Sequence, residues 1–354
     1  METVTGIITE YNPFHNGHLY HLKQAKQITN SDSIICIMNG NFTQRGIPAL
    51  TDKWTRTKMA LSNGVDLVIE LPLIYGIRSA EYFAEGAVKL LSESGVVKNL
   101  VFGSETGNIK PLSLIAKIIT EEPDDYKLVL QSYLKKGESF PSARQKALSH
   151  YMKKNSSKYS IESAKRLKEI VQIISSPNNI LGIEYLKAII KNNLNITPLT
   201  IKRVHDNYHS QNTDTKYASA TAIRELIYND NIQKCKGLIP QNCINMIKND
   251  LETDKIPIMH NNIGMMILGK LRQLTVDELK NYYEISNGLE NRFKKIAHQV
   301  GTIQEFVEKV KVKSITQTRI QRNLLHILFG LTRSEFDKMD KYGPGYLRVL
   351  GFTD

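Results

Sequence analysis

Two histidines, His15 and His18, flank Gly17 directly after a short apolar run. The β-branched run VTGIITEY predicts a strand, and GHLYHLKQAKQI has the apolar spacing of a helix. The first turn of a helix offers free N–H groups and the positive end of the helix dipole, which suit phosphate. Gly17 would let a nucleotide approach the backbone without a Cβ in the way. The two imidazoles could donate hydrogen bonds to phosphate oxygens and stabilise the charge that moves between them.

Two other interpretations of the histidine pair stay open. His15 and His18 could be metal ligands, although no third ligand follows at a clear spacing. They could also belong to an ordinary capped helix start. We expect His21, one turn further on, to be a surface or packing residue.

A second helix start of the same kind lies at residues 219–224, which read SATAIR. Ser219 is a candidate N-cap, and its hydroxyl joins that of Thr221 and the free N–H groups of the first turn. Arg224 follows one turn into the helix, where its guanidinium could bind phosphate. A capped helix would explain this segment alone. Together with the histidine pair, it predicts a site with two phosphate clamps.

Strands alternate with helices up to about residue 110, which predicts an α/β fold with a parallel sheet and helices on both faces. Residues 111–170 are helical in pattern and polar, and beyond about residue 235 the pattern predicts helices only. We expect residues 1–240 to form a Rossmann-like catalytic domain with a basic helical insertion at about 111–170. Residues 241–354 are expected to form a mostly helical, basic domain. Ligands of such sheets bind beyond the carboxyl ends of the strands.

Composition narrows the classes of protein. The 354 residues carry a formal net charge of +12, which favours polyanionic partners such as nucleic acid. The three cysteines show no CxxC spacing, so we expect neither a disulfide framework nor a cysteine zinc site. No apolar run approaches the ~20 residues that span a bilayer. The first residues lack the pattern of a signal peptide. These features predict a cytoplasmic protein without a membrane partner.

Longer segments carry a resemblance to a known family. NPFHNGH resembles the HxGH signature of nucleotidyltransferases, and SATAIR resembles their (S/T)-x-T-x-I-R element. GIITEYNPFHNGHLYHL, NGNFTQRGIPALTDKWTRTKMALSNGVDLVIELP, GESFPSARQKAL and SPNNILGIEYLKA resemble the bacterial tRNA(Met) cytidine acetate ligase family, in order from about residue 4 to 352. The resemblance implies an ATP-dependent ligase. It would form acetyl-adenylate and acetylate N4 of the wobble cytidine of elongator tRNA(Met).

The resemblance and the two helix starts give the expected site. The residues expected to bind ATP are Ile7, Ile8, Thr9, Glu10, Tyr11, Asn12, Pro13, Phe14, His15, Asn16, Gly17, His18, Leu19, Tyr20, Gly103, Asn178, Arg203, Val204, Ser219 and Thr221. His15, His18 and Arg224 are expected to be catalytic, because departing pyrophosphate needs charge neutralisation. We expect Mg²⁺ on the β- and γ-phosphates and assign it no protein ligand.

Further residues are candidates for the other two substrates. NGNFTQRG follows the second strand, so Asn41, Gln44 and Arg45 lie at the predicted ligand edge and could bind acetate. Trp54, the only tryptophan, is expected in the core, with stacking on a nucleotide base as the alternative. The residues expected to bind tRNA are Lys294, Lys295, Lys311, Lys313, Arg319 and Arg322. Such phosphate contacts would make the affinity salt-dependent.

Other functions use the same motifs. A small-molecule adenylyltransferase that joins AMP to a phosphate monoester would carry both helix starts. It would not need a basic helical region of the length found in the second half of the chain. A non-enzymatic tRNA-binding protein would not need two phosphate clamps. The acetate ligase is therefore the preferred hypothesis, with no stable protein partner expected.

Overall fold

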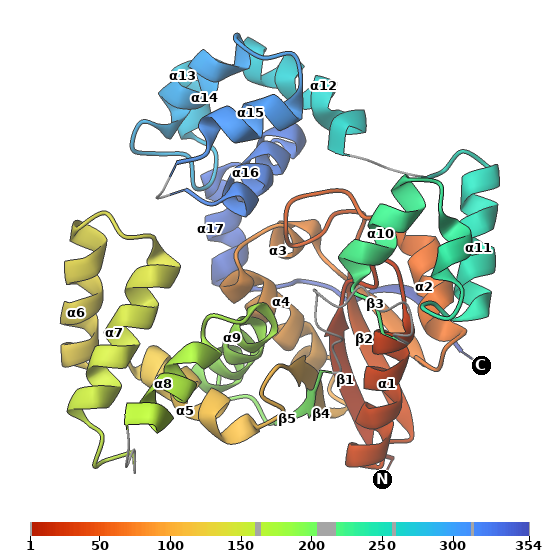
Figure 1. The fold of residues 1–354 in the computed structure, drawn as a ribbon, viewed down its shortest axis with the longest axis horizontal. Helices are drawn as coiled ribbons and strands as arrows, with labels where there is room; N and C mark the ends of the chain where they lie inside the picture. Colours follow the sequence, from red (N-terminus) through yellow and green to blue (C-terminus); the bar gives the residue numbers. More distant parts are fainter. Residues whose placement is uncertain (1, 160–163, 204–216, 257–259, 313–314, 354) are drawn as a thin grey trace.

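A single six-stranded sheet lies at the centre of the computed structural model, which describes residues 2–159, 164–203, 217–256, 260–312 and 315–353 (Figure 1). The strand order is β5-β4-β1-β2-β3-β6. The first five strands are parallel, and β6 runs antiparallel to β3. The strands are β1 (Val4–Thr9), β2 (Ser33–Asn39), β3 (Leu67–Leu71), β4 (Val97–Ser104), β5 (Thr197–Lys202) and β6 (Arg348–Phe352). Val204 and Lys313, both predicted site residues, lie outside the described residues.

Helices cover both faces of the sheet, because alternate side chains of a strand point to opposite faces. In β2, Ile35 and Ile37 join one buried cluster, whereas Ile34 and Cys36 join the other. The first face is covered by α4 (Ala80–Glu93), α5 (Ile109–Glu121) and α9 (Pro177–Lys191). The second is covered by α1 (Asn16–Thr29), α2 (Lys53–Leu61), α10 (Ala220–Tyr228) and α11 (Gln241–Glu252). This architecture confirms the predicted parallel α/β fold.

The helices between His260 and Phe329 lie away from the sheet (Figure 1). A third buried cluster is built by the bundle α12–α16 alone. The bundle and the helix after it are α12 (His260–Gln273), α13 (Val276–Lys280), α14 (Leu289–Ala297), α15 (Ile303–Val310), α16 (Gln317–Phe329) and α17 (Arg333–Tyr342). The others are α3 (Leu73–Gly76), α6 (Asp124–Lys135), α7 (Phe140–Lys154), α8 (Ala164–Ile173) and the 3₁₀-helix η1 (Ile232–Cys235).

The last strand, β6, departs from the expectation of helices only beyond about residue 235. It pairs with β3 so that Arg348 lies opposite Glu70. Leu350 is buried, and Gly351 leaves room for Leu61 and Thr57 of α2, whose side chains would lie 3.0 Å from an added Cβ. A five-residue strand after a long helical stretch gives too short a pattern to detect, and only the free edge of β3 determines its pairing.

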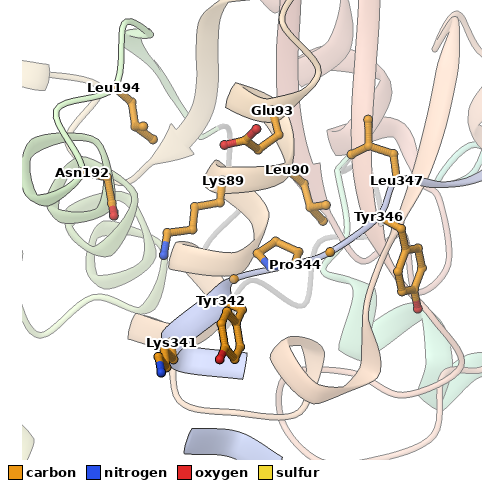
Figure 2. Close-up of a pocket in the computed structure, with 12 residues that line it drawn as sticks. Lys89, Leu90, Glu93, Asn192, Leu194, Lys341, Tyr342, Pro344, Tyr346 and Leu347 are labelled. Atoms are coloured by element: carbon orange, nitrogen blue, oxygen red, sulfur yellow. The ribbon is translucent and has the colours of Figure 1, made fainter. Parts of the chain in front are cut away.

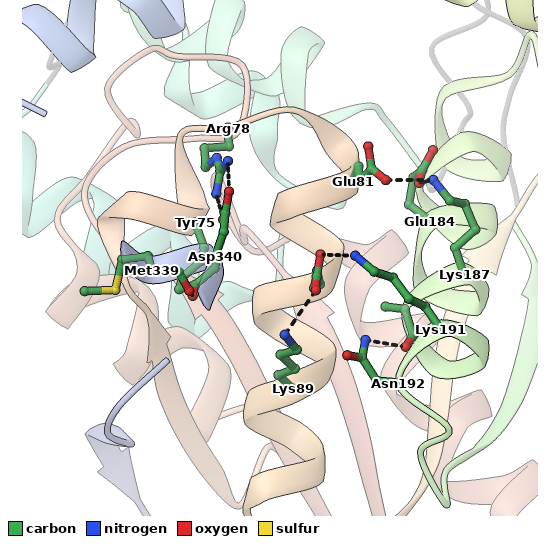
Figure 3. A network of polar contacts seen from close by, with 12 residues as sticks. Tyr75, Arg78, Glu81, Lys89, Glu184, Lys187, Lys191, Asn192, Met339 and Asp340 are labelled. Atoms are coloured by element: carbon green, nitrogen blue, oxygen red, sulfur yellow. Dashed lines mark hydrogen bonds and ion pairs between the residues drawn. The ribbon is translucent and has the colours of Figure 1, made fainter. Parts of the chain in front are cut away.

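A buried arginine joins the sheet to the last helix. Arg78 donates to both carboxylate oxygens of Asp340 in α17, at 2.5 and 3.0 Å (Figure 3). Its guanidinium lies 3.4 Å from the ring centroid of Tyr82 and 4.6 Å from that of Tyr283. Tyr75 donates to the carbonyl of Met339 at 2.9 Å beside it. These contacts hold the start of α4 and the end of the helical region together.

Candidate active site

The first helix start has the geometry of a double cap made by its two histidines. His15 is the N-cap of α1, and its Nδ1 accepts a hydrogen bond from the N–H of Gly17 at 3.0 Å. The Nδ1 of His18 accepts from the N–H of His15 at 3.3 Å. The two rings stack with centroids 3.7 Å apart. Because each Nδ1 accepts, the proton of each neutral ring lies on Nε2, which makes that atom a donor.

Burial keeps His18 neutral. Its pKa is lowered well below the usual value, first by burial and then by His15 and Arg203. The pKa of His21 is lowered to about 4 by burial and by Arg203. A neutral His18 offers one N–H to an anion without carrying a charge of its own. The arrangement therefore suits donation to phosphate oxygens rather than a charged contact.

Gly17 has a more local reason than the one expected from the sequence. A Cβ at this position would lie 2.8 Å from Cε1 of His15. The glycine is thus required by the His15 cap itself, because any side chain would displace the imidazole. Approach of a nucleotide to the backbone is a further use of the same space.

The second helix start meets the first. Ser219 is the N-cap of α10 and accepts from the N–H of Ala222 at 3.1 Å, as predicted. Arg224 donates to the carbonyl of Asn12 at 2.7 Å and to Oγ1 of Thr221 at 3.1 Å. Burial lowers its pKa, and Glu10 opposes that shift. Segments about 200 positions apart in sequence therefore place two helix N-termini beside each other.

The carboxyl ends of β1 and β2 are held by a buried arginine that the sequence analysis did not assign to the site. Arg56 is fully buried and donates to the carbonyls of Glu10 at 2.8 Å, Asn39 at 3.0 Å and Gly40. Burial lowers its pKa to about 10. The carboxylate of Glu10 accepts from the Nδ2 of Asn39 at 3.1 Å. This network fixes the loops that carry the motif.

A third part of the edge joins β4, α9 and β5. Glu105 accepts from the N–H groups of Asn178 and Asn179 at 3.2 and 2.8 Å, so its carboxylate caps α9. Arg203 donates its N–H to Ser104 O at 2.9 Å, and a Cβ on Gly103 would lie 3.0 Å from the Arg203 side chain. The structure thus brings Gly103, Asn178 and Arg203 together. Glu105 was missed, although it follows directly in the motif FGSE.

The other predicted ATP residues follow from these elements. Ile7, Ile8 and Thr9 end β1, and Asn16, Leu19 and Tyr20 belong to α1. Tyr11 and Phe14 are buried with ring centroids 4.7 Å apart, and the Asn12–Pro13 peptide bond between them is cis. The motif backbone therefore rests on a packed aromatic base.

The acetate candidates lie on one projecting loop, residues 41–50, but face different partners. Asn41 accepts from the N–H of Lys53 at 2.9 Å. The side chain of Gln44 donates to the carbonyl of Arg78 at 2.9 Å. Arg45 is exposed, and no partner is found for it in the described part of the chain. Only Arg45 of the three offers a cation to a ligand.

The described candidates for tRNA binding differ in exposure and in their hydrogen-bond partners. Lys295 and Lys311 are exposed, whereas Lys294 donates to the carbonyls of Arg272 and Leu274 at 2.7 and 2.6 Å. Arg319 donates to the carbonyl of Glu284 at 2.9 Å. Arg322 is only 8% exposed. Its backbone N lies 2.5 Å from where a Cβ on Gly46 would stand, and Gly46 adopts φ +80°.

A hollow of about 590 Å³ lies elsewhere, between the end of α4 and the segment that leads to β6 (Figure 2). Lys89, Leu90 and Glu93 line it from α4, and Tyr342 and Tyr346 line it from the segment. α4 begins near Arg78, shortly after the carboxyl end of β3, and the hollow lies at the other end of this helix. The histidine motif lies at the carboxyl ends of the strands, so the hollow is separate from it.

Within the residues that the structure describes, neither a metal cage nor a membrane-spanning helix is found. Among the described residues, no group of three or more His, Cys, Asp or Glu could hold a metal ion. The three cysteines are free and buried. No helix in the described ranges has both the length and the apolar character to cross a membrane.

The fold and the paired helix starts define a class of protein. The family model described as HIGH Nucleotidyl Transferase matches residues 1–354, and the chain belongs to that family. His15 and His18, which cap the start of α1, carry the HxGH pattern that is similar to the signature of nucleotidyltransferases.

Relatives narrow the class. A tRNA(Met) cytidine acetate ligase of Halothermothrix orenii is 52% identical over 351 residues, covering 99% of this chain and 82% of that protein. One from Acetivibrio thermocellus is 43% identical over 355 residues, covering 99% and 83%. The Thermotoga maritima TmcAL structure bound with alpha-thio ATP aligns with a TM-score of 0.91 at 38% identity, covering 99% and 81%. Within its family, the chain is a member of the tRNA(Met) cytidine acetate ligases.

Proposed function

We propose that this chain activates acetate with ATP and acetylates N4 of the wobble cytidine of elongator tRNA(Met). A carboxylate oxygen of acetate attacks the α-phosphorus, the bond to the bridging oxygen breaks, and pyrophosphate leaves. N4 of cytidine then attacks the acetyl carbon, the acyl C–O bond breaks, AMP leaves and one N4 proton passes to water. The observation that carries the proposal is the Arg224–Asn12 hydrogen bond of 2.7 Å, which joins the two phosphate-binding helix starts.

The side chains supply what the first step needs. Acetate activation requires charge neutralisation on the departing pyrophosphate rather than a protein nucleophile. Neutral His18 and His15 donate from Nε2, and Arg224 adds a guanidinium at the second helix start. Preorganised donors of this kind act most strongly where water is excluded. Arg56 contributes indirectly, because it fixes the strand ends that carry these groups.

Mg²⁺ fits the site as a companion of ATP rather than as a resident of the protein. The ion keeps several waters and binds chiefly through phosphate oxygens in such sites. When bound, the ion neutralises charge on the β- and γ-phosphates. His15, His18 and Arg224 keep their own roles as donors.

The tRNA is proposed to lie across residues 241–354, with the chemistry on residues 1–240. The separate buried cluster of α12–α16 supports a distinct helical part within residues 241–354, whereas α11 and β6 of that range pack with the sheet. Lys295 and Lys311 are the exposed cations through which the bundle would reach phosphate. Arg45 is proposed to hold the acetate carboxylate. Because ATP and tRNA are the substrates, the proposal places the protein in the cytoplasm.

Nucleoside mass spectrometry tests the function. The protein is incubated with unmodified tRNA(Met), ATP and isotope-labelled acetate, and the tRNA is then digested. We expect labelled N4-acetylcytidine that depends on ATP and is absent for His18→Ala. Acetate-dependent AMP and pyrophosphate without the labelled nucleoside would limit the activity to carboxylate activation. With neither signal, the small-molecule adenylyltransferase would replace this proposal.

A further inference from the structure

The only tryptophan of the chain, Trp54, is 52% exposed, which makes the expectation of a core position wrong. An aromatic ring of this size buries a large apolar area when it packs, so leaving half of it in water forgoes that stabilisation. The exposure is local, because Met59 and Ala60 of the same helix are fully buried. The helix is therefore well packed, and Trp54 stands outside its packed face.

The ring stands at the edge of the sheet that carries the histidine motif. Trp54 belongs to the first turn of α2, and the preceding residue, Lys53, donates its N–H to Asn41 at 2.9 Å, directly after β2. The Nζ of Lys53 also binds Glu70, at the end of β3, at 2.7 Å. Neighbouring strands are ~4.8 Å apart, so β3 is ~10 Å from β1. The first turn of α2 therefore lies at the carboxyl ends of the strands, the same end of the sheet as the histidine motif.

A cation lies beside the ring. The Nζ of Lys53 lies 5.3 Å from the ring centroid of Trp54. Arg348, opposite Glu70, reaches the same carboxylate at 3.5 Å. Lys53 and Arg348 share the Glu70 carboxylate, and the Asp52 carboxylate accepts from the N–H of Thr55 in the same helix turn as the ring, so these four charges balance. Arg45 carries a further positive charge on the loop that starts at Asn41. An exposed aromatic face beside cations is the combination by which proteins bind single-stranded nucleic acid.

We propose that Trp54 is a stacking platform for a base of the substrate RNA loop, close to the nucleotide that is modified. The inference rests on the proposed function, because it takes tRNA as the substrate. Bases of a single-stranded loop can be splayed out and stacked on aromatic side chains. The position of Trp54 on the reactive edge would orient the loop while a neighbouring cytidine reaches the activated acetyl group. Phosphates on either side of the stacked base would meet Lys53 and Arg348.

Because Trp54 is the only tryptophan, the tryptophan fluorescence of the protein reports on this residue alone. Titration of the full-length protein with unmodified tRNA(Met) is expected to quench Trp54 emission, with the same midpoint as filter binding of that RNA. Stacking is worth ~1–3 kcal/mol per base by alanine substitution, so Trp54→Ala should weaken RNA affinity roughly 5- to 150-fold. Trp54→Tyr keeps an aromatic face and should lose much less. Circular dichroism establishes that each variant is folded.

A matched control is Val96→Ala. Val96 is 48% exposed and directly precedes β4, so it lies at the amino ends of the strands, away from the histidine motif. Its replacement should leave RNA affinity unchanged. The inference is overturned when the wild-type protein binds RNA with unchanged emission, or when Trp54→Ala keeps full affinity. Quenching by ATP alone would also overturn it, because the ring would then belong to the nucleotide site. Absence of any RNA binding by the wild type would instead remove the proposed function.

Discussion

The histidine motif at the carboxyl ends of the strands, here called the histidine edge, and the helical bundle α12–α16 were both expected to bind anions. They are built in different ways. At the histidine motif, Arg224 comes from a distant segment and donates to the carbonyl of Asn12, three residues before His15. In the bundle, neighbouring lysines separate, because Lys295 faces water while Lys294 binds two backbone carbonyls. The difference teaches that a motif at a strand–helix junction predicts where its side chains lie in the fold. Basic composition does not predict which lysines and arginines lie on the surface.

The physical reason lies in what each residue type can satisfy. A cap histidine must stand where free N–H groups exist, so its position follows from the local backbone. A lysine can serve a helix C-terminus or a solvated ligand equally well. Arg322 shows the same ambiguity, because it lies almost buried against the loop that holds Gly46.

The largest effect is expected at the histidine edge. His18→Ala removes a neutral donor from the developing phosphate charge, which costs ~10²–10³ in rate for comparable donors. Acetate-dependent pyrophosphate release should fall by that factor, while RNA affinity stays unchanged. His21→Gln is the matched control, since His21 is half-buried like His18 but lies one turn further along, and it should stay close to wild type. Equal loss of RNA affinity in His18→Ala would show that the pair is structural.

A smaller loss is expected at the second helix start. Arg224→Lys keeps the charge but cannot bind the Asn12 carbonyl and Thr221 together in one planar fork. We expect pyrophosphate release to fall roughly 10- to 100-fold, in keeping with the loss of one charge-assisted contact of ~1.5–3 kcal/mol. Steady-state kinetics with varied ATP measures it. Wild-type rates for the lysine variant would mean that charge alone suffices.

A pH experiment tests the contact between His326 of the helical bundle and Ile77, which precedes α4. His326 of α16 lies 2.9 Å from the carbonyl of Ile77, and its pKa is lowered to about 4 by burial, with Arg322 and Arg78 adding to the shift. The unfolded chain takes up this proton near pH 6.5, so stability is full above that pH. It is lost as the pH falls towards 4, by ~1.4 kcal/mol per unit.

His326→Gln removes that titration. The free energy of unfolding is measured by urea denaturation between pH 7 and pH 4. Its fall per pH unit should be smaller in the variant by the contribution of one proton, ~1.4 kcal/mol. His18 and His21 keep their own contributions to the slope in both proteins. An unchanged slope would mean that the pKa of His326 is the same in the folded protein as in the unfolded chain.

The smallest effects separate two adjacent lysines. Lys295→Ala should reduce the slope of log affinity for tRNA against log salt by ~0.7–0.9, the value for one phosphate contact, and leave stability unchanged. Lys294→Ala should leave that slope unchanged and lower the free energy of unfolding by ~1–3 kcal/mol, because it removes two charge-assisted hydrogen bonds. Filter binding at several salt concentrations and urea denaturation give the two numbers. The reverse pattern would restore Lys294 as an RNA contact.

Much of the catalytic edge was predictable. Ser219 caps its helix as expected, and Gly103, Asn178 and Arg203 come together. Glu105 and Arg56 were not found, since a carboxylate in a loop and an arginine in a helix have no pattern that reveals backbone partners on other elements. Trp54 was placed wrongly for a related reason, because a single aromatic residue in a short helix does not show which side of it is covered.

The sequence by itself determined the alternation of strands and helices, the two capped helix starts and the resemblance that names the chemistry. Those features are local, and their residues act through backbone groups within four positions. Tertiary structure alone decided that Arg224 meets Asn12, that β6 returns to the edge of β3, and that Arg322 is buried while Trp54 is exposed. These depend on which elements pack together, and packing is a property of surfaces that only the folded chain brings into contact.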